Sequence, residues 1–429
     1  MFDLIVRNAN LPDGRKGIDI GIQGGKIIAV EHNLQAQAGE EIDATDRLVS
    51  PPFVDPHFHM DATLSLGLPR MNVSGTLLEG IALWGELRPI VTKEELVDRA
   101  LRYCDLAVTQ GLLFIRSHVD TSDPRLVTVE AMIEVREKVA PYIDLQLVAF
   151  PQDGYYRSPG AIDALNRALD MGVDIVGGIP HFERTMGEGT ASVEALCRIA
   201  VDRGLPVDIH CDETDDPLSR HIETLAAETI RFGLQGRVAG SHLTSMHSMD
   251  NYYVSKLIPL MAEAEINVIP NPLINIMLQG RHDTYPKRRG MTRVRELMDA
   301  GLNVSFGHDC VMDPWYSMGS GDMLEVGHMA IHVAQMAGID DKKKIFDALT
   351  VNSAKTMGLE GYGLEKGCSA DLVILQASDT LEALRLKPHR LAVIRRGKVI
   401  ARSAPRIGEL FLDGRPARID GGLDYVPRY

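Results

Sequence analysis

The sequence predicts an α/β protein, namely a closed (β/α)8 barrel of the TIM type with a small β-sandwich domain built from both termini. Three observations predict this fold. From about residue 48, short β-rich runs alternate eight times with amphipathic helical runs. Both ends of the chain have strand-like patterns without helical periodicity. The 429 residues are enough for a barrel of ~250 residues and a smaller module.

The candidate barrel strands are short runs that end in polar residues. They cover residues 48–55, 112–120, 144–150, 174–182, 206–212, 237–243, 267–274 and 303–309. Helical runs such as KEELVDRALRYCDLAVTQG and SVEALCRIAVDRG separate them, and several of these runs end in glycine, as helices often do. Right-handed βαβ units in this number favour a closed barrel. An open doubly wound sheet is the alternative architecture.

The two ends of the chain are expected to fold together. Residues 2–31 alternate with period two around the turn Gly24-Gly25-Lys26, and residues 369–377 and 391–402 return to β structure. Neither end has enough strands for a stable sheet of its own. We therefore predict one small β domain from residues 1–50 plus 360–429, and a catalytic barrel from residues 51–359.

Charge and cysteine usage narrow the class of function. The 45 Lys+Arg and 59 Asp+Glu give a net charge of −14, which disfavours nucleic acid polymers and anionic membranes as partners. The five scattered cysteines contain no C-x-x-C pair, so a reducing cytoplasm is expected. The N-terminus lacks a signal-peptide pattern, and no apolar run approaches the ~20 residues of a membrane span. We expect a cytoplasmic enzyme for a small molecule.

Titratable residues gather at the ends of the predicted strands. They are His57 and His59 on the first strand, His210 on the fifth, His242 on the sixth and Asp309 on the eighth. Active sites of such barrels lie at this end of the strands. Imidazoles with one carboxylate make a plausible site for Zn²⁺ or Fe²⁺ that leaves a position open for water. A pair of hydrogen-bonded structural histidines is the alternative reading of His57 and His59.

The pattern and several longer strings resemble the amidohydrolase superfamily, and within it the bacterial-type cytosine deaminases. The strings are PPFVDPHFHMD, SGTLLEGIALW, VAFPQDG, IPHFE, HCDETDD, SHLTSMHS, NPLINIMLQGRHDTYPKRRGMTRV and GHDCVMDPW. The resemblance implies that His57, His59, His210 and Asp309 bind one divalent metal ion, zinc or iron, with His242 unliganded as a base or water-orienting group. The chain has no lysine between Lys138 and Lys256, which independently excludes a pair of ions bridged by a carboxylated lysine on the fourth strand.

The resemblance also implies a mechanism. Glu213, in the string HCDE, matches the proton shuttle of the family; a solvated loop carboxylate is the alternative. A metal-bound hydroxide is expected to attack C4 of a pyrimidine while Glu213 protonates N3. His242 and Asp309 then assist the departure of ammonia.

Further residues are expected to bind the substrate. The resemblance implies that the Gln152 side chain hydrogen-bonds to the carbonyl and N–H of the substrate ring, and that the backbone at Leu77 makes a further contact. The alternative is a turn glutamine that is only solvated. Phe150 and Trp315 are expected to pack against the substrate ring, and the alternative is that they belong to the hydrophobic core. Cys310 stands where these deaminases usually have a second aspartate, and the exchange could open space for a methyl group. Neutral drift is the alternative at this position.

The predicted function is hydrolytic deamination of free cytosine and 5-methylcytosine to uracil and thymine. Gln152, HCDE and the PKRRG segment (residues 286–290) favour a pyrimidine. Alternatives on the same scaffold are isoguanine, a triazine amine or a creatinine-like ring, because loops change substrate without touching the metal site. A catalytically inactive assembly protein is a further alternative. The family also leads us to expect a homo-oligomer.

Overall fold

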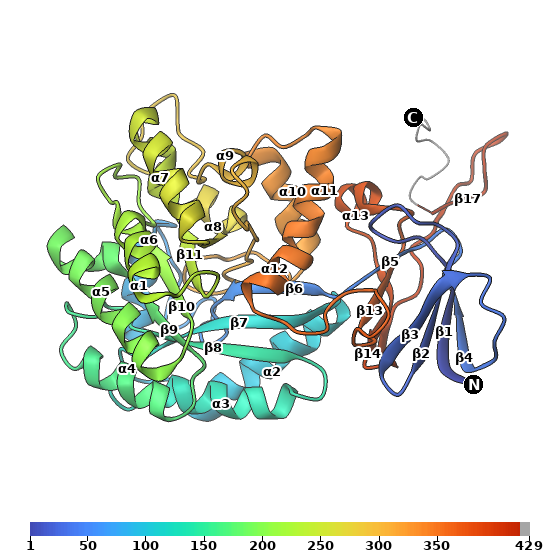
Figure 1. The fold of residues 1–429 in the computed structure, drawn as a ribbon, viewed down its shortest axis with the longest axis horizontal. Coiled ribbons are helices and arrows are strands. Elements are labelled where there is room, and N and C mark those ends of the chain that lie inside the picture. Colours follow the sequence, from blue (N-terminus) through green and yellow to red (C-terminus); the bar gives the residue numbers. More distant parts are fainter. Residues whose placement is uncertain (421–429) are drawn as a thin grey trace.

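The computed structural model describes residues 1–420, and the larger of its two parts is a nearly closed parallel barrel surrounded by helices (Figure 1). Seven strands follow one another around the barrel in chain order. They are β6 (Phe53–Phe58), β7 (Leu112–Asp120), β8 (Asp144–Phe150), β9 (Ile175–Gly178), β10 (Val207–Cys211), β11 (Val238–His242) and β12 (Asn267–Ile269). These strands are buried along their lengths, apart from partly buried positions at the start of β8, as expected of a sheet covered by helices. The predicted fold class is confirmed.

The eighth predicted strand closes the barrel in an irregular way. Residues 303–309 make isolated parallel bridges, Val304 with Val268 of β12 and Asp309 with Phe58 of β6. The Asp309 N–H donates to the His57 carbonyl and the His59 N–H donates to the Asp309 carbonyl, both at 2.9 Å. The prediction of a regular strand at 303–309 is therefore wrong. Asp309 has a φ of 72°, which a regular strand does not accommodate.

The first predicted strand is also divided. Leu48–Ser50 form β5, which pairs with a C-terminal strand in another sheet, and only β6 belongs to the barrel. Pro51 and Pro52 separate the two strands and lack the backbone N–H that a continuous ladder needs. The chain thus passes from the small part into the barrel at this point.

The helices pack around the barrel (Figure 1). They are α1 (Leu77–Leu87), α2 (Lys93–Thr109), α3 (Val127–Val139), α4 (Ala161–Asp170), α5 (Met186–Arg203), α6 (His221–Phe232), α7 (Asn251–Glu263), α8 (Pro272–Leu278), α9 (Val294–Asp299), α10 (Met323–Val333), α11 (Ile339–Ala348), α12 (Val351–Thr356) and α13 (Thr380–Leu386), with 3₁₀ helices η1 (Pro180–Phe182) and η2 (Thr244–Ser248). In the view of Figure 1, α2 and α3 lie below the barrel strands and α7 and α10 lie above them. Local sequence fixes their ends: Thr92 and Glu95 form a capping box at α2, and Gly204 ends α5 with a φ of 69°. Within residues 1–420 no helix is both long enough and apolar enough to cross a bilayer.

The smaller part contains two four-stranded sheets that share one buried apolar cluster. The first sheet has the order β3 (Lys26–His32), β2 (Ile18–Gln23), β1 (Phe2–Ala9), β4 (Ala38–Asp43). The second has the order β15 (Lys398–Arg402), β14 (Arg390–Arg395), β13 (Leu372–Leu375), β5. A short pair, β16 (Gly408–Glu409) and β17 (Arg418–Ile419), follows.

The expectation that the N-terminal residues cannot form a sheet alone is wrong, because the unpredicted strand β4 pairs in parallel with β1. The two sheets nevertheless join both termini in one core. The proposed division at residues 50 and 360 stays a prediction, and residues 421–429 of the predicted small domain lie outside the described residues.

Ion pairs of two buried arginines connect the smaller part to the barrel. Arg390 of β14 pairs with Asp322, the N-cap of α10. Arg395 of the same strand binds Asp144 at the start of β8 at 2.6 Å and Asp371 at 2.8 Å. Both arginines are almost fully buried, so each depends on its carboxylates for compensation of its charge.

Candidate active site

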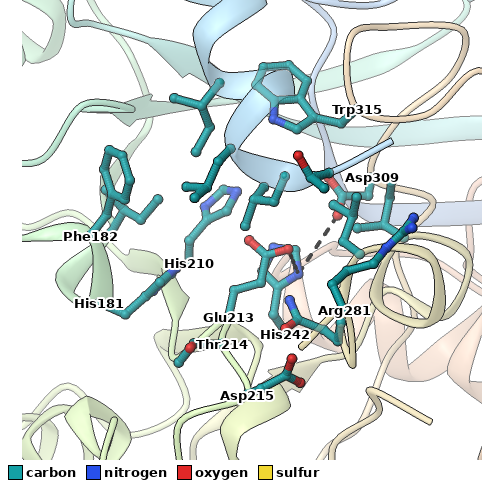
Figure 2. A pocket seen from close by; sticks show the side chains of 18 of the residues that line it. His181, Phe182, His210, Glu213, Thr214, Asp215, His242, Arg281, Asp309 and Trp315 are labelled. Atoms are coloured by element: carbon teal, nitrogen blue, oxygen red, sulfur yellow. Dashed lines mark ion pairs between the residues drawn. The ribbon is translucent and has the colours of Figure 1, made fainter. Parts of the chain in front are cut away.

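A cavity of about 500 Å³ lies at the carboxyl ends of the barrel strands. Its walls combine apolar side chains of α1 and α8 with polar side chains from the strand ends (Figure 2). Among its lining residues are His59, His210, Glu213, His242 and Asp309, all predicted from the sequence. This is the position at which barrel enzymes of this type place their active sites.

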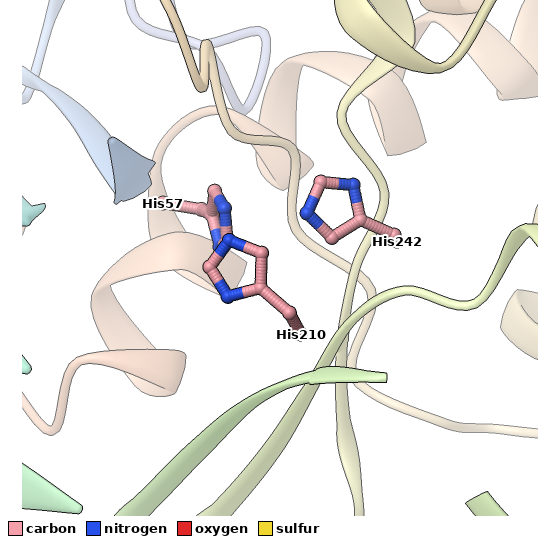
Figure 3. A group of neighbouring side chains, drawn as sticks. All are labelled: His57, His210 and His242. Carbon is pink, nitrogen blue, oxygen red and sulfur yellow. The ribbon is translucent and has the colours of Figure 1, made fainter. Parts of the chain in front are cut away.

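Histidine and aspartate side chains from distant strands converge at the base of this cavity. His59 Nε2 lies 3.0 Å from His210 Nε2, and Asp309 Oδ1 lies 3.4 Å from His59 Nε2 and 3.6 Å from His57 Nε2. Three groups with the spacing of metal ligands share His57: the first adds His59 and Asp309, the second adds His210 and His242, and the third adds His118 and Asp208. Figure 3 shows the rings of the second group turned toward one another.

The donor set fits a divalent metal ion. His57 Nε2 and Asp309 Oδ2 are buried and have no hydrogen-bond partner. Burial lowers the pKa of His57 and His210 well below the usual range and that of His59 to about 4, so these imidazoles are neutral and can donate lone pairs. Burial, with the nearby Glu213, raises the pKa of Asp309, and a cation beside it would favour the ionised form. Nitrogen and carboxylate ligands of this kind suit zinc.

Glu213 follows β10 on a tightly held turn. The preceding residue, Asp212, accepts hydrogen bonds from Ser219 and from the backbone N–H groups of His221 and Ile222. Glu213 is itself buried, and burial raises its pKa to about 8. Its carboxyl group therefore keeps its proton to a higher pH than an exposed glutamate does, and its Oε1 lies 3.5 Å from His242 Nδ1.

The hydrogen bonds of His242 define its tautomer. Asn275 Oδ1 accepts from the Asn271 backbone N–H at 3.0 Å, which leaves the Asn275 amide nitrogen to face His242. That nitrogen donates to His242 Nδ1 at 3.0 Å. Because Nδ1 accepts from Asn275, we assign the ring proton to Nε2; the amide nitrogen of Asn271 lies 3.3 Å from Nδ1 and 3.4 Å from Nε2. Dashed lines in Figure 2 join His242 to Glu213 and Asp309.

Comparisons with known proteins agree with this geometry. A model of the amidohydrolase family matches residues 40–402. The chain belongs to the amidohydrolase family. N-isopropylammelide isopropyl amidohydrolase of Pseudomonas sp. (strain ADP) is 30% identical over 412 residues, which cover 94% of this chain and 98% of that relative.

Solved amidohydrolase structures superpose over nearly the whole chain. A crystal structure of 5-methylcytosine deaminase from Klebsiella pneumoniae, liganded with phosphonocytosine, has a TM-score of 0.92 and 42% identity and covers 95% of this chain and 100% of its own. That of N-isopropylammelide isopropylaminohydrolase from Burkholderia multivorans has a TM-score of 0.81 and 25% identity, with coverage of 94% and 99%. This amidohydrolase is therefore a hydrolase, and the reading as an inactive assembly protein has no support.

Not all of the predicted substrate-binding residues line the cavity of this amidohydrolase. Gln152, Leu77, Cys310 and Trp315 all line the cavity. Phe150 is fully buried and stacks on His210, with ring centroids 4.1 Å apart and planes at 16°, and it is not among the lining residues. Trp315 is thus the aromatic side chain of the predicted pair that can meet a substrate.

Several residues of the site were missed by sequence reasoning. The predicted strand 267–274 ends at Ile269, and Pro272 instead starts α8, which carries Asn275 to His242. A proline after a short strand, at the first turn of a helix, was the available signal. His181, Thr214 and Asp215 also line the cavity from the loops after β9 and β10.

The PKRRG segment does not line the cavity. The ammonium group of Lys287 donates to the carbonyls of Gly280 and Asp283, both at 3.0 Å, and Arg288 pairs with Asp283 at 2.6 Å. These cations hold the loop that follows α8 in shape. Gln279, Arg281 and His282, at the beginning of the loop, reach the cavity instead.

Proposed function

We propose that this amidohydrolase deaminates free pyrimidine bases, converting cytosine and 5-methylcytosine with water into uracil or thymine and ammonia. The observation that carries the proposal is the buried Glu213 beside the convergent His/Asp donors, in a cavity that also presents Gln152 and Cys310. The 42% identity over the full length of a 5-methylcytosine deaminase supports the substrate class.

His57, His59, His210 and Asp309 would hold one divalent ion, zinc or iron. When bound, such an ion lowers the pKa of coordinated water, so that a strong nucleophile is available near neutral pH. His242 would remain outside this set, because its Nδ1 is occupied by Asn275 and its Nε2 carries a proton.

The chain's own residues supply the proton transfers. Glu213 donates its proton to ring N3 as water adds to C4, and this neutralises the charge that develops on the ring. One proton of the added water passes through Glu213 to the amine, the C4–N4 bond breaks and ammonia leaves. The second proton of the water returns to Glu213, so that C4 becomes a carbonyl and the acid is restored. The Nε2–H of His242 orients the oxygen at C4. The carboxamide of Gln152 pairs with O2 and N1–H, and Trp315 covers the ring.

Cys310 favours substrates with a 5-methyl group. Its side chain is buried, lines the cavity and donates from Sγ to Asp309 Oδ1 at 3.5 Å. Burial, with Asp313 and Asp309 nearby, raises the pKa of this thiol well above its usual range, so the group is neutral and weakly polar. A neutral sulfur tolerates a neighbouring methyl group better than a hydrated carboxylate would.

A triazine ring with an N-alkyl amine is the second candidate substrate. Two N-isopropylammelide amidohydrolases cover nearly the whole chain, one of them at 30% identity. The cavity of about 500 Å³ also falls in the range that holds drug-sized ligands, larger than a single pyrimidine requires.

Ammonia and amine release by the zinc- or iron-reconstituted enzyme tests the proposal. The substrates are cytosine, 5-methylcytosine, isoguanine, creatinine and N-isopropylammelide, compared by kcat/KM. We expect 5-methylcytosine to be preferred, and Glu213→Gln to lose nearly all turnover while it keeps the metal. Isopropylamine as the main product would select the triazine candidate, and a Glu213→Gln variant near the wild-type rate would remove the assigned acid.

A further inference from the structure

A hydrogen-bonded chain of buried residues continues from His57 into the barrel, away from the cavity. His57 Nδ1 lies 2.9 Å from Ser241 Oγ, and Ser241 Oγ donates to Asp208 Oδ1, also at 2.9 Å. Each of the three residues has 0% exposed surface. Their hydrogen-bond partners are therefore limited to one another and to their protein neighbours.

Strand register brings these residues together. Ser241 of β11 pairs directly with His210 of β10, and Asp208 lies two residues before His210 on the same strand. Since alternate residues of a strand share a face, Asp208 and His210 point to the same side of β10. His57, at the end of β6, reaches them across the barrel interior.

The hydroxyl of Ser241 has one proton, and this fixes the direction of both bonds. Asp208 offers only acceptor oxygens, because Arg116 Nη1 pairs with its Oδ2 at 2.9 Å. Ser241 must donate to Asp208 and consequently accepts from His57. The His57 proton therefore lies on Nδ1, and the lone pair of Nε2 points to Asp309, 3.6 Å away.

Arg116 is the last member of this hydrogen-bonded series, and its other guanidinium nitrogens also have acceptors. Its guanidinium also donates to Gln146 Oε1 at 3.0 and 3.1 Å and to the Thr356 carbonyl at 3.1 Å. This pairing also explains the third group with ligand-like spacing, His57, His118 and Asp208. Both Asp208 oxygens are already used by Arg116 and Ser241, so that group does not require an ion of its own.

We propose that Ser241, Asp208 and Arg116 act as positioning residues that hold His57 as the Nδ1–H tautomer, with Nε2 ready to bind a metal ion. The inference rests on the proposed function for the ion, but the tautomer is a property of the metal-free chain. Partners of this kind orient ligating histidines and raise their basicity, and their loss typically costs about 10–100-fold in metal affinity.

The first test is zinc affinity, measured on the full chain by competition with a chromophoric chelator. We expect Ser241→Ala to weaken zinc binding by about 10–100-fold. Ser192→Ala is the matched control, because Ser192 is equally buried and bonds only to the Gly189 carbonyl within α5. The control should bind zinc within about twofold of the wild type.

The second test is the position of the His57 proton in the metal-free protein, by long-range ¹⁵N–¹H correlation after ¹⁵N-histidine labelling. The His57 signal is identified by its loss in His57→Gln. We expect the Nδ1–H pattern in the wild type and a mixture of both tautomers in Ser241→Ala. If Ser241→Ala does not fold, Asp208→Asn is measured instead. The new side-chain amide at position 208 can donate to Ser241, which leaves the serine proton free to point to His57.

The outcomes separate the two proposals. If the wild type binds no zinc, the proposed metal site fails, while the tautomer measurement still decides the positioning role. Unchanged zinc affinity together with an unchanged Nδ1–H pattern in a folded Ser241→Ala or Asp208→Asn variant would overturn the positioning role alone.

Discussion

Replacing Cys310 by aspartate should reverse the preference of the enzyme for a 5-methyl group. The thiol lies in the cavity wall, 3% exposed, next to the proposed metal ligand Asp309. An aspartate there introduces a hydrated polar group at the place where we position the methyl. Selection for one methyl in an apolar slot amounts to about 1–3 kcal/mol, or roughly 10–200-fold.

The same substitution has a second effect that must be separated from the first. Asp309 lies adjacent in the chain, and the buried Asp313 has its pKa raised to about 6. Two unit charges about 4 Å apart interact by about 4 kcal/mol at an effective dielectric constant of 20. A new carboxylate in this cluster is therefore expected to slow both substrates, whatever its effect on selectivity.

The decisive quantity is the ratio of kcat/KM for 5-methylcytosine to kcat/KM for cytosine. We expect Cys310→Asp to lower this ratio by about 10-fold or more. Cys310→Ala is the matched control, because it keeps an apolar wall without the thiol and should leave the ratio within about threefold. Metal content is measured for each variant, so that a lost ion is not mistaken for a changed pocket.

An unchanged ratio would refute the reasoning. If Cys310→Asp slows both substrates equally and retains its metal, the residue acts on Asp309 and not on the ring. A ratio that falls equally in Cys310→Ala would assign selectivity to the thiol itself and not to the absence of a carboxylate.

Three further predictions concern the acid, the histidine orientation and the contact between the two parts. Burial raises the pKa of Glu213 to about 8, so its acid form is present below that pH and kcat/KM should fall as pH rises through this region; a bound cation shifts the fall to lower pH. Asn275→Asp offers His242 Nδ1 an acceptor in place of a donor and moves the ring proton away from Nε2, so kcat should fall by ~10²-fold with KM little changed. Arg390→Met leaves Asp322 buried without its cation and should lower the free energy of unfolding in urea by about 3–5 kcal/mol.

Each of these has a clear contrary result. A kcat/KM that does not fall anywhere between pH 5 and 9, in a reaction limited by chemistry, would contradict Glu213 as the acid. An Asn275→Asp variant with wild-type kcat would show that the His242 N–H is not used, and Asn275→Ala serves as its control. Arg390→Met with an unchanged urea midpoint would mean that Asp322 finds other compensation, and the exposed Arg102→Met variant is the control for a lost surface charge.

The positions of the metal-ligand candidates could be predicted because they interrupt strongly apolar strands. The candidates His57, His59, His210 and Asp309 stand at or near strand ends, and a parallel barrel brings all such ends to one face. The strand ends meet at this face whatever the register between neighbouring strands. The alternation of strands and helices was sufficient.

The partners of these residues depend on register and could not be predicted. His57 and Ser241 are 184 residues apart, and nothing local marks Ser241 or Asp208 as different from other polar residues in a strand. The strand β4 was missed because its sequence, AGEEID, is largely exposed and lacks apolar alternation. The strand expected at 303–309 was wrong because the backbone turns into the left-handed region at Asp309.

The irregular closure of the barrel has a consequence for its stability. The junction between β12 and β6 is built by residues 303–309, and His57, His59 and Asp309 stand on its two sides. An ion shared by these three side chains would join the first and last segments of the barrel, and its binding energy would then count toward folding. Loss of the ion would loosen the barrel along this one line, where amide hydrogens of residues 304–309 would exchange first, while the seven regular strands kept their protection.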